Sequence, residues 1–194
     1  MARILPAMAS QMIIVFFLLY SFSATFVSAA EEQGFGTPLD PKQHKLKKEK
    51  LSHFHFFFHD ILSGRNPTAI QVVPPATNTS KTGFGSVAIM DDPLTVGPNL
   101  SSKTIGKAQG LYASASQEAF SLLMVMNFAF TEGKYNGSSL SIVGRNPGGT
   151  REFPVVGGSG LFRFARGYAL ATTHSFNLTS GDAVVEYNVY VFHY

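Results

Sequence analysis

The 194-residue sequence contains no cysteine and no tryptophan, and only 14% of its residues are charged. Without cysteine the chain can form no disulfide, no thiolate nucleophile, no iron–sulfur cluster and no cysteine-ligated zinc site. The sequence also lacks a Gly-x-Ser-x-Gly elbow, a Gly-rich loop followed by Lys-Ser/Thr and a His-Glu-x-x-His motif. The common hydrolase, nucleotide-binding and metalloprotease classes are therefore excluded, and stability must come from packing or from oligomerisation.

Soluble proteins usually carry about 25% charged residues, and here the shortfall accompanies 18 glycines, 18 phenylalanines and 7 tyrosines. This composition predicts a β-rich folded domain rather than a disordered chain, and the length suits one domain. The net charge of +3 is concentrated in residues 41–50, which hold five lysines. No basic surface with interleaved aromatic residues is visible, so no nucleic-acid partner is expected.

The N-terminal segment predicts a cleaved secretory signal over residues 1–30. Arg3 is followed by an apolar run at 12–20 and then by small residues that end at Ala29 and Ala30. The alternative, an uncleaved membrane anchor, would need about 20 apolar residues to span a bilayer. The protein is therefore expected to be secreted, without stable insertion into a membrane.

Residues 31–50 are polar and without periodicity, which predicts a flexible basic arm before the domain at 51–194. The lysines of the arm suit a solvated tail, and contact with an anionic wall polymer or membrane is the alternative. Four Asn-x-Ser/Thr sequons are candidate glycosylation sites. Their asparagines are Asn78, Asn99, Asn136 and Asn177.

From Leu51 onward the hydrophobic pattern has a period of two, interrupted every ten or so residues by Gly, Pro or Asn clusters, which is typical of consecutive antiparallel strands. Asp91-Asp92-Pro93 and Gly157-Gly-Ser-Gly160 are interpreted as turns. A helix is the alternative for 119–130, and brief pairing of 152–156 is left open. Eight strands are predicted: 52–60, 68–73, 83–90, 104–115, 119–130, 135–143, 162–174 and 183–194.

Eight such strands can close into an up-and-down antiparallel β-barrel, which removes every free edge and leaves room for one small ligand. The segment 119–130 is apolar on both faces. Because its outer face would meet water in a single barrel, we expect that face to be buried against another subunit in a homo-oligomer, a dimer or a trimer.

The first predicted strand places Phe54, Phe56, Phe58 and Asp60 on one face. The opposite face carries three histidines, which could suggest a metal site. No carboxylate shares their parity, so we interpret them as structural and predict no metal. They are His53, His55 and His59.

A sparse polar set remains against this aromatic background, and polar groups in an apolar barrel usually face a ligand. Asp91 and Asp92 precede Pro93 and are interpreted as turn formers, and Arg163 and Arg166 as braces of the barrel end. The other members are Asp60, Tyr112, Arg145, Asn146 and Arg151.

Five motifs at compatible spacing resemble those of plant dirigent proteins, over residues 51–194. They are Phe58-His-Asp-Ile61, Met90-Asp-Asp-Pro-Leu-Thr95, Gly106-Lys-Ala-Gln-Gly-Leu-Tyr112, Val156-Gly-Gly-Ser-Gly160 and Phe164-Ala-Arg-Gly167. The resemblance, which includes the disease-resistance-response and pterocarpan-synthase-like branch, implies an eight-stranded, allene-oxide-cyclase-like barrel secreted to the apoplast or cell wall.

The resemblance also implies a function in lignan biosynthesis and plant defence. Such a protein directs the stereoselective coupling of phenoxy radicals from a monolignol such as coniferyl alcohol. A separate laccase or peroxidase makes the radicals, so no cofactor is expected. The implied catalytic residues are Asp60, Tyr112 and Arg151, and the implied substrate-binding residues are Phe58, Phe128, Arg145 and Asn146.

One position departs from the pattern of lignan-forming members, in which an aspartate follows the sixth strand. This sequence has Asn146 there, and an amide cannot donate a carboxyl proton. The departure keeps a second hypothesis open: a pterocarpan-synthase-like lyase that dehydrates an isoflavanol through a quinone methide, for which one acid suffices. A third is a non-catalytic binding module of the cell wall.

Overall fold

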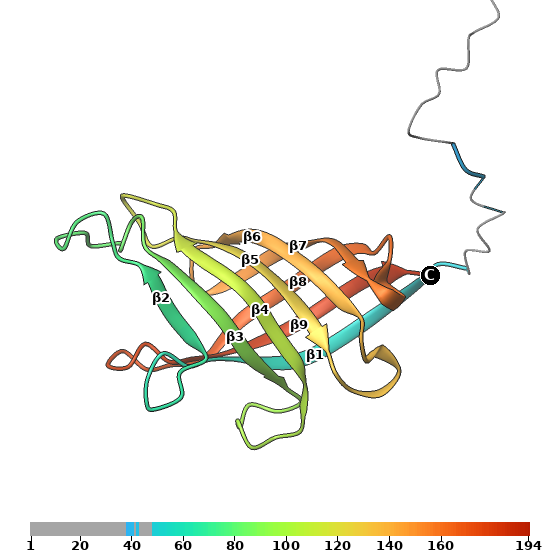
Figure 1. Ribbon diagram of the computed structural model, residues 1–194, viewed down its shortest axis with the longest axis horizontal. Coiled ribbons are helices and arrows are strands. Elements are labelled where there is room, and N and C mark those ends of the chain that lie inside the picture. The colour runs from blue at the N-terminus through green and yellow to red at the C-terminus, as the bar shows by residue number, and fades with distance from the viewer. Residues whose placement is uncertain (1–37, 41, 43–47) are drawn as a thin grey trace, which may run out of the picture. The chain divides into compact units, whose positions relative to one another are not determined.

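The computed structural model describes residues 38–40, 42 and 48–194 (Figure 1). The predicted signal and most of the predicted arm lie outside the described residues. In the described part, no helix is long and apolar enough to cross a membrane. The strands are β1 Lys50–Asp60, β2 Ala69–Val73, β3 Val87–Thr95, β4 Thr104–Ser114, β5 Leu122–Phe130, β6 Ser139–Asn146, β7 Thr150–Ser159, β8 Arg166–Phe176 and β9 Ala183–His193, with 3-10 turns η1 Gly133–Tyr135 and η2 Gly160–Phe162.

The strands form one antiparallel barrel (Figure 1). Strands β3 to β9 follow one another as neighbours, and β1 pairs with β9 along its whole length. The barrel closes at a seam, where β1 pairs with β3 through Phe57–Thr95 and Phe58–Leu94. The predicted eight-stranded up-and-down barrel is confirmed, and its eight strands are β1 and β3 to β9.

The strands that form the barrel differ from the predicted ones in two places. The short β2 pairs only with β3 and adds a ninth strand at the seam. The eighth strand of the barrel is instead β7, which pairs with β6 and β8. It extends through Gly157–Ser159, residues that the sequence predicted to form a bend. Glycine pairs usually mark turns, but here they continue a strand. The segment 119–130 is a strand, β5, as predicted.

Strand β3 also runs through Asp91-Asp92-Pro93, which the sequence predicted as a turn. Proline is tolerated in a strand where no ladder hydrogen bond is needed from its nitrogen. Pro93 meets this condition, because it lies between the β2 ladder that ends at Met90 and the β1 ladder that begins at Leu94. Alternation therefore continues and turns Asp92 inward.

A buried histidine locks the seam from its outer side. His59 is 3% exposed, and its Nε2 lies 2.7 Å from Oγ1 of Thr95. That hydroxyl donates its one proton to the carbonyl of Gly97 at 2.7 Å, so His59 must be the donor through Nε2–H. Burial lowers the pKa of His59, which keeps the ring neutral. His53 and His55 instead bond Asn188 and Glu186 across the outer face.

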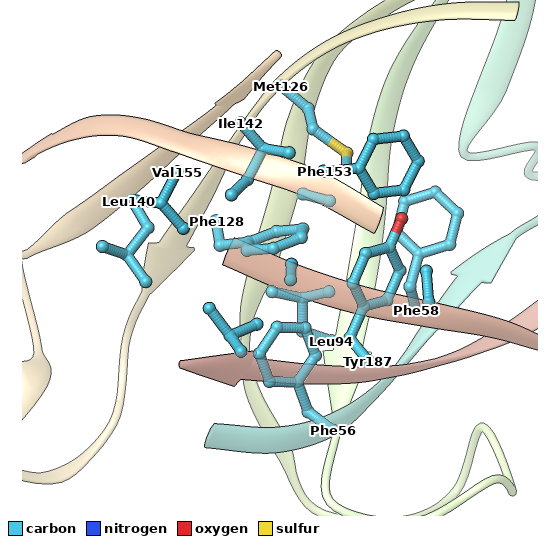
Figure 2. Packing of buried hydrophobic residues seen from close by; sticks show 14 of the residues in the cluster. Phe56, Phe58, Leu94, Met126, Phe128, Leu140, Ile142, Phe153, Val155 and Tyr187 are labelled. Carbon is cyan, nitrogen blue, oxygen red and sulfur yellow. The ribbon is translucent and has the colours of Figure 1, made fainter. Parts of the chain in front are cut away.

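The interior is filled by inward-facing aromatic and aliphatic side chains (Figure 2). The ring of Phe56 lies 5.1 Å from that of Phe128 and 5.8 Å from that of Tyr187. The end of the barrel where β1 begins is closed by a cluster of stacked and edge-on rings. Its members are Phe54, Phe130, Tyr135, Phe162 and His193.

Two glycines allow the neighbouring strands β4 and β5 to approach closely. A Cβ at Gly106 would collide with the carbonyl oxygen of Ala129, and one at Gly110 with that of Val125. Both glycines pair in regular register with β5, so the close approach is a feature of the ladder itself. Gly157 differs, because a Cβ there would meet open space.

We expect Gly110→Ala to lower the free energy of unfolding by about 3 kcal/mol, because the new methyl group forces β4 away from β5 in a packed barrel. Chemical denaturation measures the change. The matched control is Gly157→Ala, which should leave the free energy within about 0.5 kcal/mol of the wild type. Equal effects of the two substitutions would contradict the close approach.

Candidate functional site

A cavity of about 470 Å³ occupies the barrel end opposite the aromatic cluster. It lies where β1, β4, β6 and β8 end and where β5, β7 and β9 begin. Tyr187 forms part of its floor, and Phe120 and Phe176 lie at its mouth, more than half exposed. Most of the lining is apolar. The polar side chains in it are Asp60, Tyr112, Asn146, Arg151, Thr173 and Tyr187.

Asp60 is the last residue of β1 and turns inward because it shares the parity of Phe56 and Phe58. Within the described residues, its Oδ1 is buried and has no hydrogen-bond partner. Burial raises the pKa of Asp60 to about 6, although interaction with the Tyr112 hydroxyl lowers it, and the charge of Asp182 raises it further. Asp60 is thus a carboxylic acid that keeps its proton in mildly acidic water.

Tyr112 reaches the cavity from β4, next to Met124 of β5. Burial raises the pKa of Tyr112 above that of an ordinary tyrosine, and the neighbouring carboxyl groups of Asp60 and Asp92 also raise it. The side chain therefore stays a neutral phenol, which can donate one hydrogen bond within the site.

Arg151 enters the cavity from β7 and is 8% exposed. Its Nη1 donates to the carbonyl of Gly149 at 2.6 Å and to Oγ1 of Thr173 at 2.8 Å. Its buried Nε has no partner among the described residues. Burial lowers the pKa of Arg151, but a guanidinium still stays charged in neutral water. The site therefore holds a buried cation with donor capacity to spare.

Asn146 closes the turn between β6 and β7. Its Oδ1 accepts a hydrogen bond from the backbone N–H of Gly148 at 3.0 Å. Its Nδ2 lies 3.9 Å from the sulfur of Met124, a weak contact. The amide oxygen thus fixes the loop, and the amide nitrogen is the part that can serve a ligand.

The structure brings together five of the predicted site residues: Asp60, Tyr112, Arg151, Asn146 and Phe58 all line the cavity. Two others lie elsewhere. Arg145 follows the opposite parity to Asn146 on β6, so it points outward and bonds Oγ of Ser121 at 3.0 Å. Phe128 points inward but lies deeper, against Phe56 and Tyr187, and does not line the cavity.

Sequence reasoning missed Thr173, Tyr187 and Asp92. Strand parity could have found the first two, because Thr173 shares a face with Ala171, and Tyr187 with Val185. Asp92 was hidden by its turn-like context but is fully buried on β3. Burial raises its pKa to about 8, a hydrogen bond from Thr68 lowers it, and the charge of Asp60 raises it.

A second hollow of about 980 Å³ lies beside the cavity and shares Asp60, Phe176 and Ala183 with it. It is lined by the β3–β4 and β8–β9 connections, with Leu100 and Leu178 strongly exposed. We assign the site to the inner cavity, because that cavity joins Asp60 and Tyr112 with the cation of Arg151 in an apolar enclosure.

The arrangement suits a neutral ligand with an apolar body and oxygen atoms on its rim. Phe58, Leu122, Met124 and Val185 offer apolar surface, while the polar groups can donate hydrogen bonds to oxygen. Among the described residues, no group of three His, Asp or Glu side chains is placed to hold a metal ion. Asp60 can also act as a proton donor.

Comparisons with known proteins agree with this architecture. The family model described as Dirigent-like protein matches residues 51–192. Dirigent protein 21 of Arabidopsis thaliana is 52% identical over 91% of this chain and 96% of its own. Pterocarpan synthase 1 of Glycyrrhiza echinata is 49% identical over 80% of this chain and 85% of its own.

Among solved structures, the pterocarpan synthase dirigent protein GePTS1 superposes with a TM-score of 0.72. It is 51% identical in sequence, and the match covers 76% of this chain and 87% of that one. With the family model covering nearly all of the barrel and relatives of about half identity covering most of the chain, this protein belongs to the dirigent family.

Proposed function

We propose that this protein is a dirigent protein that holds phenolic reactants in its barrel and directs the stereochemistry of the bond they form. The observation that carries the proposal is the cavity itself, in which Asp60 and Tyr112 share an apolar enclosure with Arg151, whose Nε has no partner in the part of the chain that the structure describes. The leading reaction is the coupling of monolignol radicals, such as those of coniferyl alcohol, to optically active lignans.

In this function the protein contributes orientation. Phenoxy radicals couple without a large barrier, so selectivity depends on which face of each ring is presented. Aromatic and aliphatic walls from Phe58, Leu122 and Met124 restrict the rings. Radical formation needs a one-electron oxidant, which a separate laccase or peroxidase supplies.

Asp60 acts as the proton donor that follows coupling. The coupled product is a bis-quinone methide, and protonation of its oxygen activates the methide carbon, which is attached to the ring, toward attack by a hydroxyl. An acid works best when its pKa lies near the working pH. Burial brings the pKa of Asp60 to about 6, which suits the mildly acidic medium outside plant cells.

Arg151 anchors the phenolic oxygen that carries negative charge as a quinone methide forms or collapses. Its Nε has no partner in the described structure, and its Nη1 is held in place by Gly149 and Thr173. A fixed cation in an apolar cavity stabilises a developing oxyanion strongly, because little solvent screens it.

Asn146 favours a second candidate reaction, the dehydration of an isoflavanol by a pterocarpan-synthase-like lyase. Asn146 has no acidic proton, and its Oδ1 accepts a hydrogen bond from the backbone N–H of Gly148. Asp60 is the only carboxylic acid among the residues that line the cavity. One acid suffices to expel a hydroxyl as water and leave a quinone methide. Relatives named pterocarpan synthase share about half of the sequence.

Secretion to the apoplast or cell wall is part of the proposal. The sequence supports it through the signal-like segment 1–30, and surface exposure of the sequons is compatible with glycosylation in the secretory pathway. The sequon asparagines are all exposed, outside the strands: Asn78, Asn99, Asn136 and Asn177.

We also propose that the barrels associate as a homo-oligomer through the outer face of β2 to β6. Directly paired outward residues form a continuous apolar row there: Ile70, Ile89, Leu111, Val125 and Val143. A second row contains Val73, Val87, Ala113 and Leu123. A polar row of Asp91, Gln109, Asn127 and Ser141 bounds the patch. An apolar patch with a polar border, repeated on an identical subunit, is suited to self-association.

Two incubations test the leading function and its alternative. With coniferyl alcohol and a one-electron oxidant, we expect pinoresinol in enantiomeric excess by chiral chromatography. With an isoflavanol and no oxidant, accelerated dehydration would instead establish the lyase. Racemic pinoresinol at saturating protein, together with no acceleration over buffer, would leave the protein as a binding module of the cell wall.

Asp60→Asn should slow the acid-assisted step about 100-fold, because the amide keeps the shape of the carboxyl but has no acidic proton. Ring closure or dehydration is measured at pH 5, where the raised pKa keeps the wild-type acid protonated while an ordinary aspartate would be ionised. Arg145→Gln, outside the cavity, is the control. Unchanged ring closure and stereochemistry in Asp60→Asn would make Asp60 merely structural.

Val125→Lys should dissociate the oligomer, because it places a charge in the centre of the apolar row. Light scattering after size exclusion would show monomer at micromolar concentration, with subunit affinity weaker by at least about 100-fold. Asn127→Lys on the bounding polar row is the control and should stay assembled. A wild-type chain that is already monomeric would refute the interface.

A further inference from the structure

Asp92 is a buried carboxyl group that the proposed mechanism has not used. It lies on β3 between the inward residues Met90 and Leu94 and is fully buried. Its Oδ1 accepts a hydrogen bond from Oγ1 of Thr68 at 2.5 Å. Its Oδ2 is buried and has no partner among the described residues. A carboxylate left in this state is costly, so the group needs a proton or a nearby partner.

Asp60 and Asp92 lie at the same end of the seam, on β1 and β3. Phe57 pairs with Thr95 and Phe58 with Leu94, so Asp60 and Asp92 each lie two residues beyond the last pair, and they are near enough for the charge of Asp60 to act on Asp92. Asp60 also has a buried oxygen without a partner in the described structure. Two such acids cannot both ionise without strong repulsion.

Thr68 holds this pair at the place where β1 gives way to β2. Its hydroxyl donates to Asp92 and accepts the N–H of Ile61 at 3.2 Å. Its backbone bonds both strands: the N–H donates to the carbonyl of Ile61, and the carbonyl accepts the N–H of Asp91. The position of Asp92 relative to β1 is therefore fixed by a rigid connection.

We propose that Asp60 and Asp92 form a proton-sharing pair, in which Asp92 is a positioning residue that retains a proton beside the catalytic acid after Asp60 has ionised. The proposal rests on the function assigned above to Asp60. Asp92 itself is not in the cavity lining, so it acts through Asp60 and does not touch the substrate.

The surrounding charges favour retention of this proton. Tyr112 faces the pair from β4 and stays neutral, and the cation of Lys107 pairs with Asp91 on the outer face. Asp182 lies near Asp60, and Tyr187 and Arg151 complete the inner surroundings. Once Asp60 loses its proton near pH 6, its charge helps to raise the pKa of Asp92 to about 8. Between these values the pair holds one proton.

The protons balance over a cycle. Asp60 gives its proton to the quinone-methide oxygen, or to the hydroxyl that leaves as water, and takes the proton of Asp92 in turn. Attack of a substrate hydroxyl on the methide carbon then releases that hydroxyl's proton, which restores the pair. No oxidant, metal or external acid enters this step.

Carbon-13 NMR of labelled aspartate carboxyls tests the pair without any substrate. In the wild type we expect coupled titrations near pH 6 and near pH 8. In Asp60→Asn the midpoint of Asp92 should fall by about one pH unit, because the neighbouring charge is gone. An Asp92 midpoint that does not move in Asp60→Asn would overturn the proposal, whether or not the assigned reaction is correct.

The activity test uses Asp92→Asn with the substrate that the wild type converts, coniferyl alcohol plus oxidant or an isoflavanol. The ratio of the rate at pH 7.5 to that at pH 5.5 should fall about tenfold relative to wild type, because the retained proton is lost. Glu152→Gln, an exposed acidic residue on the outward face of β7, is the control and should keep the wild-type ratio. A loss that is equal at both pH values would reduce Asp92 to a structural role. Absence of wild-type turnover would refute the assigned function, while the titration would still decide the pair.

Discussion

The barrel depends on a seam of two residue pairs. Strand β1 is bound to β9 over eleven residue pairs but to β3 only through Phe57–Thr95 and Phe58–Leu94. His59, neutral because burial lowers its pKa, donates to Thr95 and fixes this register from outside. Since side chains alternate along a strand, a slip by one residue would turn Asp60 out to solvent and His59 inward. The register that closes the barrel is thus the same one that positions the acid.

The interior is divided between stability and binding. Rings from β1, β5, β7, β9, η1 and η2 fill one half, with Phe56, Phe128 and Phe153 packed around Tyr187. Tyr187 also lines the cavity, so the packed half supplies the floor of the open half. The mouth belongs to connections and strand ends, which contribute Phe120, Gly148–Gly149 and Phe176. Substrate preference can therefore change at the mouth while the floor and the acid stay fixed.

Alternation in the sequence predicted much of this arrangement and failed where a local signal competed with it. It gave the inward face of β1 through to Asp60, and it placed β5 as a strand despite its helix-favouring residues. It failed at Asp91-Asp92-Pro93, where a turn signal concealed a strand whose proline sits in a gap between ladders. It was applied incompletely at Arg145 and Asn146, which as neighbours cannot both face the cavity. Closure at the seam, which brings Asp60 and Asp92 to the same end of the β1–β3 ladder, joins segments that no local pattern relates.

The buried ionisable groups of the site are bonded to neutral groups and not to one another. Arg151, Asp60 and Asp92 lie in one barrel, yet Arg151 donates its hydrogen bonds to Gly149 and Thr173. Asp92 accepts a hydrogen bond from Thr68. A structural ion pair would have brought cation and carboxylate into contact, because each buried charge is costly alone. Their separation leaves an apolar gap with hydrogen-bonding capacity on either side, which folding alone does not satisfy. A flat phenolic molecule with oxygen atoms at opposite ends can satisfy both sides at once, and it is held in one orientation because the two sides differ in charge.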